Sequence, residues 1–174
     1  MFFVLLTTVA LQGCVSLGGG LNAFADDIDG YRFLYPNGWV QIKVSNNLDV
    51  VFHDIIEQTE NISVVINPVP GRKTLADLGS ASEVGYQLSK SAIAPPDSGR
   101  TAELIDAQER ETNGRPYYQL EYLVKLPDGS ERHNLATATI SRGKLFTLNA
   151  STPEIRWEAM KAPLEQSIKS FLVN

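Results

Sequence analysis

The fold is decided by residues 113–126, which read Asn-Gly-Arg-Pro-Tyr-Tyr-Gln-Leu-Glu-Tyr-Leu-Val-Lys-Leu. The pair Asn113-Gly114 is the strongest short signal for a two-residue β-hairpin turn. From Tyr118 to Leu126 apolar residues then recur at every second position, which is typical of a strand with one buried face. The stretch therefore predicts the second strand of a hairpin in an antiparallel sheet.

Neighbouring strands extend this hairpin into a meander. Turn residues at 113–114, 127–130 and 142–143 divide the second half of the chain into short β-rich runs. The predicted strands are 102–112, 118–126, 135–141 and 145–150. Because they are adjacent in sequence and joined by tight turns, we expect them to pair antiparallel.

The first half of the chain predicts four more strands. Residues 31–35 and 39–44 alternate on either side of the turn Pro36-Asn37-Gly38, which indicates a hairpin. Further β-rich runs span 48–56 and 62–66.

Two segments have helical periodicity instead. Ser80-Ala-Ser-Glu83 is a capping-box pattern, and an apolar face follows it as far as Ala92. Residues 152–171 carry an apolar stripe with Pro163 inside it, which predicts two short helices or one helix kinked at Ala162. The order ββββ-α-ββββ-α predicts an α+β fold in which helices cover an antiparallel sheet.

The N-terminal residues resemble a bacterial export signal. An apolar run too short to span a bilayer ends in Leu11-Gln12-Gly13-Cys14, and Cys14 is the only cysteine. This pattern is similar to a lipobox, whose cysteine receives a lipid and becomes the new N-terminus. It predicts a signal peptide at 1–14, a flexible Gly-rich linker at 15–29 and a folded domain at 30–174.

Two other interpretations of the N-terminus stay open. Ala23-Phe24-Ala25 fits ordinary secretory cleavage, which would release a protein without a lipid. Alternatively, residues 2–11 form a buried strand or helix.

Composition excludes some classes of function. The chain has 174 residues and a net charge of −5, so we expect no binding to nucleic acid, whose partners carry basic patches. No nucleophile elbow, phosphate-binding loop or His-Glu-x-x-His motif is present. Ser141, His133 and Asp128 could be combined into a catalytic triad, but their spacing does not distinguish that arrangement from chance. We therefore expect no enzymatic activity.

Metal binding is the more plausible chemistry for the two histidines. His133 follows the carboxylates of 128–131, and His53 adjoins Asp54 with Glu57 and Glu60 nearby. Imidazole with carboxylate suits zinc, and carboxylates suit calcium or manganese. The spacing is not that of a structural zinc site, so we expect at most weak binding of Zn, Ca or Mn, with no certain cofactor.

Basic residues gather at the predicted turns, and they would form a docking patch for an acidic partner if those turns share one edge. They are Arg72, Lys73, Arg115, Arg132, Arg142, Lys144 and Arg156.

Several motifs resemble the PsbP family, which comprises extrinsic proteins of the photosystem II oxygen-evolving complex. The opening Gly30-Tyr-x-Phe33-x-Tyr35-Pro36-x-x-Trp39 is similar to the start of that domain. Further matches follow in the family's order at Asn61–Pro68, Leu78-Gly79, Glu83–Gly85, Tyr118–Tyr122, Gly143–Phe146 and Ser170–Val173. The resemblance covers 29–174, and the lipobox is similar to that of the cyanobacterial branch.

The resemblance implies an α/β/α sandwich with a central antiparallel sheet flanked by helices. It implies a non-enzymatic, monomeric lipoprotein on the lumenal side of the thylakoid membrane. Such a protein would bind lumenal subunits of photosystem II and support its assembly or the stability of the oxygen-evolving complex. It also implies metal ligands at His133 and Glu154. The alternatives are a lumenal carrier of Zn, Ca or Mn, and a lumenal enzyme of unrecognised type.

Overall fold

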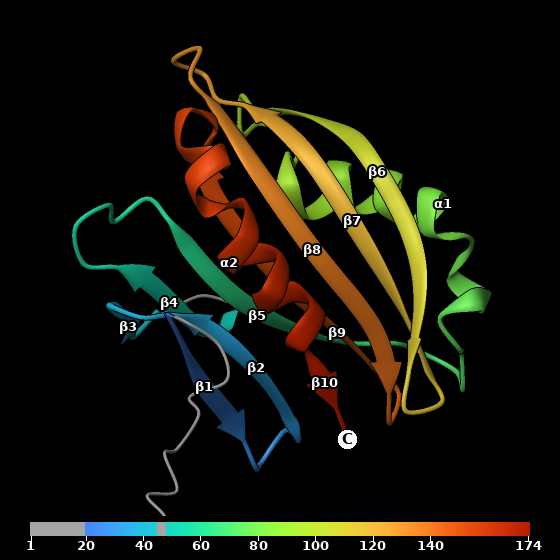
Figure 1. Cartoon of the computed structure of the whole chain (residues 1–174). Coiled ribbons are helices and arrows are strands. Elements are labelled where there is room, and N and C mark those ends of the chain that lie inside the picture. The colour runs from blue at the N-terminus through green and yellow to red at the C-terminus, as the bar shows by residue number, and fades with distance from the viewer. Residues whose placement is uncertain (1–19, 45–47) are drawn as a thin grey trace, which may run out of the picture.

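The computed structural model describes residues 20–44 and 48–174, and it shows one large sheet with a helix on each face (Figure 1). The predicted signal peptide, the predicted lipidation site Cys14 and the start of the predicted linker lie outside the described residues. The α+β class and the flanked antiparallel sheet are confirmed.

The large sheet has seven antiparallel strands in the order β3-β4-β5-β9-β8-β7-β6. Their bounds are β3 (Trp39–Ile42), β4 (Leu48–Asp54), β5 (Asn61–Pro68), β6 (Thr101–Thr112), β7 (Arg115–Lys125), β8 (Glu131–Ser141) and β9 (Lys144–Pro153). The predicted meander is therefore confirmed. Asn113 and Gly114 connect β6 to β7 with φ of 55° and 73°, the left-handed values that a tight hairpin turn requires.

A second sheet of three strands, β1-β2-β10, corrects two predictions. Its strands are β1 (Leu21–Asp26), β2 (Tyr31–Pro36) and β10 (Leu172–Val173). The predicted hairpin between β2 and β3 is wrong, because β1 and β10 occupy the two edges of β2 while β3 pairs with β4. The predicted linker is also wrong over β1, because the Phe24 ring packs 5.4 Å from Phe33 and 5.3 Å from Phe52.

Helix α1 (Ala81–Leu88) packs on β6 and β7, and the π-helical turn η2 (Ser89–Ile93) continues it. Its capping box is confirmed, since Ser80 Oγ accepts from Glu83 N while Ser80 N donates to the Glu83 carboxylate. Gly85 lets the helix approach the sheet closely, because a Cβ there would lie 3.0 Å from Leu104 and Leu120.

Helix α2 (Trp157–Ser170) packs on β2, β8 and β9. The short 3-10 turns η1 (Ala76–Leu78) and η3 (Glu154–Arg156) precede the two helices. Of the two predicted forms, a pair of short helices is wrong, since α2 is one helix that contains Pro163. Leu164 and Ile168 are buried beyond the proline, so packing stabilises the second half of the helix despite the backbone hydrogen bond that proline cannot donate.

Alternation along β7 divides the core between the two faces of the large sheet. Tyr117 belongs to the cluster beneath α2 and the small sheet, whereas Tyr118 and Tyr122 belong to the cluster beneath α1. The Tyr122 hydroxyl donates to Gly85 O at 2.9 Å, so the buried polar group is satisfied. Over the residues that the structure describes, no helix is both long and apolar enough to cross a membrane.

Candidate functional site

His133 stands between two carboxylates on the α2 side of the large sheet. Its Nδ1 lies 2.9 Å from Glu154 Oε2, and its Nε2 lies 2.7 Å from Glu121 Oε1. The imidazole is only 4% exposed and stacks on the Trp157 indole, with 3.6 Å between ring centroids and 8° between planes. Strand, turn and helix therefore hold the ring at both nitrogens and over one face.

Three elements bring these groups together. His133 begins the buried run of β8, and Glu154 lies in η3, where β9 turns into α2. The structure thus brings the two residues that the resemblance singles out into contact. Sequence reasoning missed Glu121, although its place on the opposite face of β7 from Tyr122 puts it on the side where His133 lies.

The contacts constrain the protonation of the ring. A carboxylate accepts hydrogen bonds, and a neutral imidazole has only one N–H to donate. Both nitrogens can therefore donate only when the ring is protonated. A neutral ring satisfies both contacts only when a proton on one carboxyl group, or a metal ion, takes the place of the missing N–H proton.

The spacing of His133 and Glu154 fits a metal ion after a small adjustment. Zinc binds nitrogen and oxygen at about 2.0–2.2 Å, so two tetrahedral ligand atoms lie about 3.3 Å apart. The observed 2.9 Å must widen by a few tenths of an ångström, and the Glu154 side chain is 36% exposed and can shift. Glu121 faces the other ring nitrogen, so one ion cannot bind all three residues.

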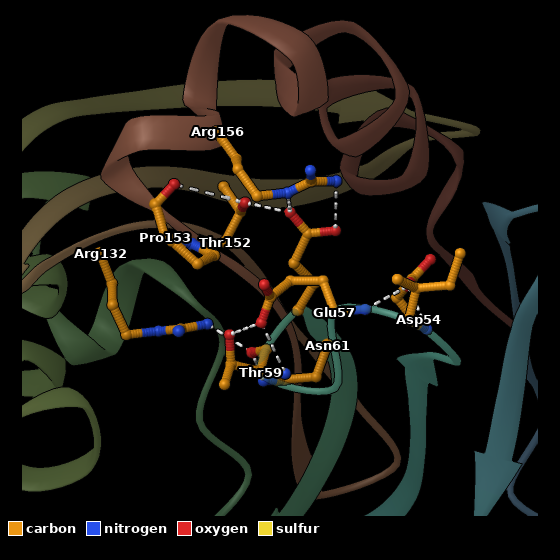
Figure 2. A network of polar contacts seen from close by, with 10 residues as sticks. Asp54, Glu57, Thr59, Asn61, Arg132, Thr152, Pro153 and Arg156 are labelled. Atoms are coloured by element: carbon orange, nitrogen blue, oxygen red, sulfur yellow. Dashed lines mark hydrogen bonds and ion pairs between the residues drawn. The ribbon is translucent and has the colours of Figure 1, made fainter.

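A buried glutamate anchors the turn that carries Glu154. Glu60 is 0% exposed, and its Oε1 accepts from the Thr152 hydroxyl at 2.7 Å and from Arg156 Nε at 2.5 Å. Figure 2 shows this network between the β4–β5 loop and the start of α2. The hydrogen bond to Glu60 raises the pKa of Arg156. Because Arg156 lies in η3, the pair holds η3 against the sheet.

The carboxylates near His53 in sequence, which were possible metal ligands, have other partners in the described structure. Asp54 Oδ1 accepts from the backbone N–H groups of Ile56 and Glu57, both at 2.7 Å, and so shapes the β4–β5 loop. Glu57 accepts from the Thr59 hydroxyl at 2.6 Å, which lowers the Glu57 pKa. Glu60 is paired with Arg156. Each carboxylate has a structural use, and none contacts His53 among the described residues.

The possible catalytic triad of Ser141, His133 and Asp128 does not form. Ser141 lies eight residues beyond His133 on the same strand, about 26 Å away at the rise of an extended chain. Its hydroxyl donates to Asn174 O at 2.9 Å, and Asp128 accepts from Ser130 in the β7–β8 turn.

An acidic cluster that the sequence did not predict joins the end of β1, the β1–β2 turn and β4. Oxygen atoms of Asp26, Asp29 and Asp49 lie within 4.8 Å of one another. Donors of the chain itself already engage them. Asp26 accepts from two backbone N–H groups, Asp29 pairs with Lys144 at 3.0 Å, and Asp49 accepts from the Tyr31 hydroxyl. Burial and Asp49 together raise the pKa of Tyr31.

The basic turn residues do gather in part. Arg72, Lys73, Arg115 and Arg142 line a cavity of about 640 Å³ at one end of the large sheet, which we call the basic hollow. Arg132 and Arg156 lie elsewhere, since Arg132 donates to Thr59 O at 2.5 Å and Arg156 holds Glu60.

Comparison with known proteins gives consistent matches. The family model described as PsbP matches residues 19–173. A protein named CyanoP from Thermosynechococcus vestitus is 50% identical over 169 residues, which cover 95% of this chain and 92% of that protein. The solution structure of cyanobacterial PsbP (CyanoP) from Synechocystis sp. PCC 6803 superimposes with a TM-score of 0.77 at 45% identity, covering 94% of this chain and 99% of that one. The photosynthetic NDH subunit of lumenal location 1 from Arabidopsis thaliana is 30% identical, covering 83% of this chain and 58% of that protein.

Proposed function

The chain belongs to the PsbP family, and we propose that it is a non-enzymatic accessory protein of photosystem II on the lumenal side of the thylakoid membrane. There it supports assembly of the photosystem or stability of the oxygen-evolving complex. The observation that carries the proposal is the match of nearly the whole folded chain to this family. The separation of Ser141 from His133 and the structural use of the carboxylates agree with a binding role.

A lipid on Cys14 is the proposed tether to the membrane. Two acyl chains or more hold a protein at a bilayer firmly, and tethering raises its effective concentration near a membrane partner. The position of β1 supports cleavage before Cys14, because cleavage after Ala25 would remove most of that strand and Phe24 with it. A relative named for a lumenal location supports the compartment.

Affinity purification of the tagged full-length chain from solubilised thylakoid membranes tests the proposal. We expect photosystem II subunits to be enriched in the eluate relative to an untagged strain. Enrichment of NDH subunits in their place would contradict the proposed partner. Mass spectrometry of the same eluate is expected to find acyl groups on Cys14, and Cys14→Ala is expected to move the chain to the soluble fraction.

A second candidate function is weak metal binding at His133 and Glu154, which the 2.9 Å contact between their side chains favours. In this proposal Glu154 and Nδ1 bind the ion, while Glu121 accepts from Nε2–H and orients the ring. Carboxylates commonly orient zinc-binding histidines in this way. The protein supplies two ligands, so water or a partner completes the site.

Titration calorimetry with Zn²⁺ near neutral pH tests the metal site. We expect His133→Ala and Glu154→Gln to remove the heat of binding and Glu121→Gln to weaken affinity about tenfold. Affinity should fall as the pH falls, because the ion and protons compete for the imidazole. The control is His53→Ala, and equal binding by this variant and His133→Ala would exclude the site.

A further inference from the structure

The basic hollow lies where three connections meet at one end of the large sheet. They are the segment between β5 and η1, the β6–β7 turn and the β8–β9 turn, which come together near the C-terminus of the chain (Figure 1). Segments far apart in sequence therefore build one concave surface.

The hollow has a charge opposite to that of the chain. The whole sequence has 15 basic and 20 acidic residues and a net charge of −5. The lining contains four basic residues and no aspartate or glutamate. Because a cleft lined by one sign of charge focuses the field, the hollow attracts anions although the molecule as a whole repels them.

Two of the four cations are held in place by the protein. Arg115 Nη1 donates to Ile140 O at 3.0 Å. Arg142 donates to Asp29 O, and its guanidinium lies 5.9 Å from the centre of the Phe146 ring. These contacts use carbonyl oxygens and a ring face, so both guanidinium groups keep their charge without a carboxylate partner.

The other two cations are exposed. The side chains of Arg72 and Lys73 make no hydrogen bond or ion pair with any residue in 20–44 or 48–174. The neighbouring acid Asp77 accepts from the Thr74 backbone and hydroxyl at 2.7 and 2.8 Å. These bonds, with a smaller contribution from Lys73, lower the pKa of Asp77. Asp29 is paired with Lys144.

We propose that the basic hollow binds an acidic segment of a partner protein. This inference rests on the proposed function, because the segment would belong to the photosystem II partner. Apolar side chains of Val69, Pro116 and Ile140 line the hollow between the cations. Such a surface suits the backbone and methylene groups of a peptide while the cations pair with its carboxylates.

Shape and charge favour a peptide over other anions. A single phosphate would leave most of a cavity of about 640 Å³ empty. A bilayer surface is broad and cannot enter a concave site, and an anionic bilayer would repel a chain with net charge −5.

A matched pair of double variants tests the proposal in the full-length chain. Arg72→Gln/Lys73→Gln removes the two exposed cations of the hollow. Arg100→Gln/Lys125→Gln removes two exposed cations from the opposite end of the β6–β7 hairpin. The net charge changes equally in both variants. The probe is a poly-glutamate peptide, with poly-glutamine of the same length as its control.

We expect poly-glutamate to bind the wild type and the Arg100→Gln/Lys125→Gln variant with similar, salt-sensitive affinity. The Arg72→Gln/Lys73→Gln variant loses two charge pairs with the peptide. It should therefore bind poly-glutamate about tenfold more weakly than the wild type. Amide shifts in NMR spectra should concentrate at 69–75, 113–116 and 140–143. Equal affinity of the two variants would overturn the proposal, as would binding of phosphate or anionic vesicles without binding of poly-glutamate.

A second arm separates this inference from the proposed function. If wild type fails to retain photosystem II subunits, the proposed function fails, whatever poly-glutamate does. If wild type and Arg72→Gln/Lys73→Gln retain them equally, the proposed function stands and the role of the hollow is wrong.

Discussion

At the scale of single residues, His133 is a buried polar side chain held by several partners. Carboxylates face both of its nitrogens, and an indole covers its ring. Hydrogen bonds between charged groups are about twice as strong as those between neutral ones. His133 therefore stabilises the junction of β7, β8 and α2 whether or not a metal binds.

His133→Ala is expected to lower the free energy of unfolding by about 2–4 kcal/mol, because it leaves a cavity beside Trp157 and two carboxylates without their partner. Urea unfolding followed by tryptophan fluorescence measures this loss. His53→Ala is the control, with an expected loss below about 1 kcal/mol. Similar losses for both variants would contradict the structural role of His133.

Glu60→Gln tests the pair that holds η3. Loss of the charge weakens the bonds from Thr152 and Arg156, and we expect a loss of about 1–3 kcal/mol in the free energy of unfolding. The control is Glu57→Gln in the same loop, which should cost less stability, because the Glu57 carboxylate accepts hydrogen bonds only from nearby Thr59. If Glu60→Gln is as stable as the wild type, Glu60 does not anchor η3.

The residues around His133 show how far sequence reasoning can predict a proposed metal site. His133 could be found because histidines are rare in the chain, and Glu154 came only from the family resemblance. Glu121 was missed, since alternation places it on the correct face but does not say which strand neighbours it. Glu60 was grouped with His53 by proximity in sequence, whereas its partners lie 92 and 96 residues away.

At the scale of elements, local signals predicted the parts whose partners are close in sequence. The meander from β6 to β9 and the capping box of α1 are of this kind. The small sheet could not be predicted in this way, because β10 pairs with β2 across most of the chain. The β2–β3 hairpin was wrongly predicted for the same reason. No local signal shows that β1 and β10 pair with the two edges of β2.

Ser80→Ala is expected to destabilise the fold by about 1 kcal/mol, because the helix loses the oxygen that accepts from Glu83 N. Thermal unfolding measures the change. Ser82→Ala makes the same chemical change two positions into the helix and should not reduce stability. Equal losses in the two variants would exclude a capping role for Ser80.

The same capping box predicts a pH dependence. Bonds from the Ser80 backbone and hydroxyl lower the pKa of Glu83. A carboxylate with a lowered pKa stabilises the fold above its unfolded pKa and loses that effect as the pH falls through its folded pKa. Glu83→Gln should therefore be less stable than the wild type at pH 7, with the gap closing below about pH 4. A constant gap would contradict this assignment.

Phe24→Ala tests whether β1 belongs to the folded domain. We expect a loss of about 1–3 kcal/mol, because Phe24 packs against Phe33 and Phe52 and is partly buried. Chemical unfolding provides the value, with Asn22→Ala in the same strand as the control. No difference between the two variants would restore the linker interpretation.

At the scale of the whole molecule, composition and order of elements were enough to predict the class of fold. The described domain is an antiparallel sheet enclosed by α1 on one face and by α2 with the small sheet on the other. Four basic turn residues line one hollow because their turns lie at the same end of the large sheet. The residues of a turn do not by themselves show which other turns lie beside it.

The central proposal is a tethered, non-enzymatic domain that binds photosystem II from the lumen. Cross-linking mass spectrometry on intact thylakoid membranes tests this most directly, because it reads the neighbours of the native chain in place. We predict cross-links to lumenal segments of photosystem II from Lys73, which lines the basic hollow, and from Lys144, which follows the lining residue Gly143. Cross-links confined to other complexes would contradict the central claim.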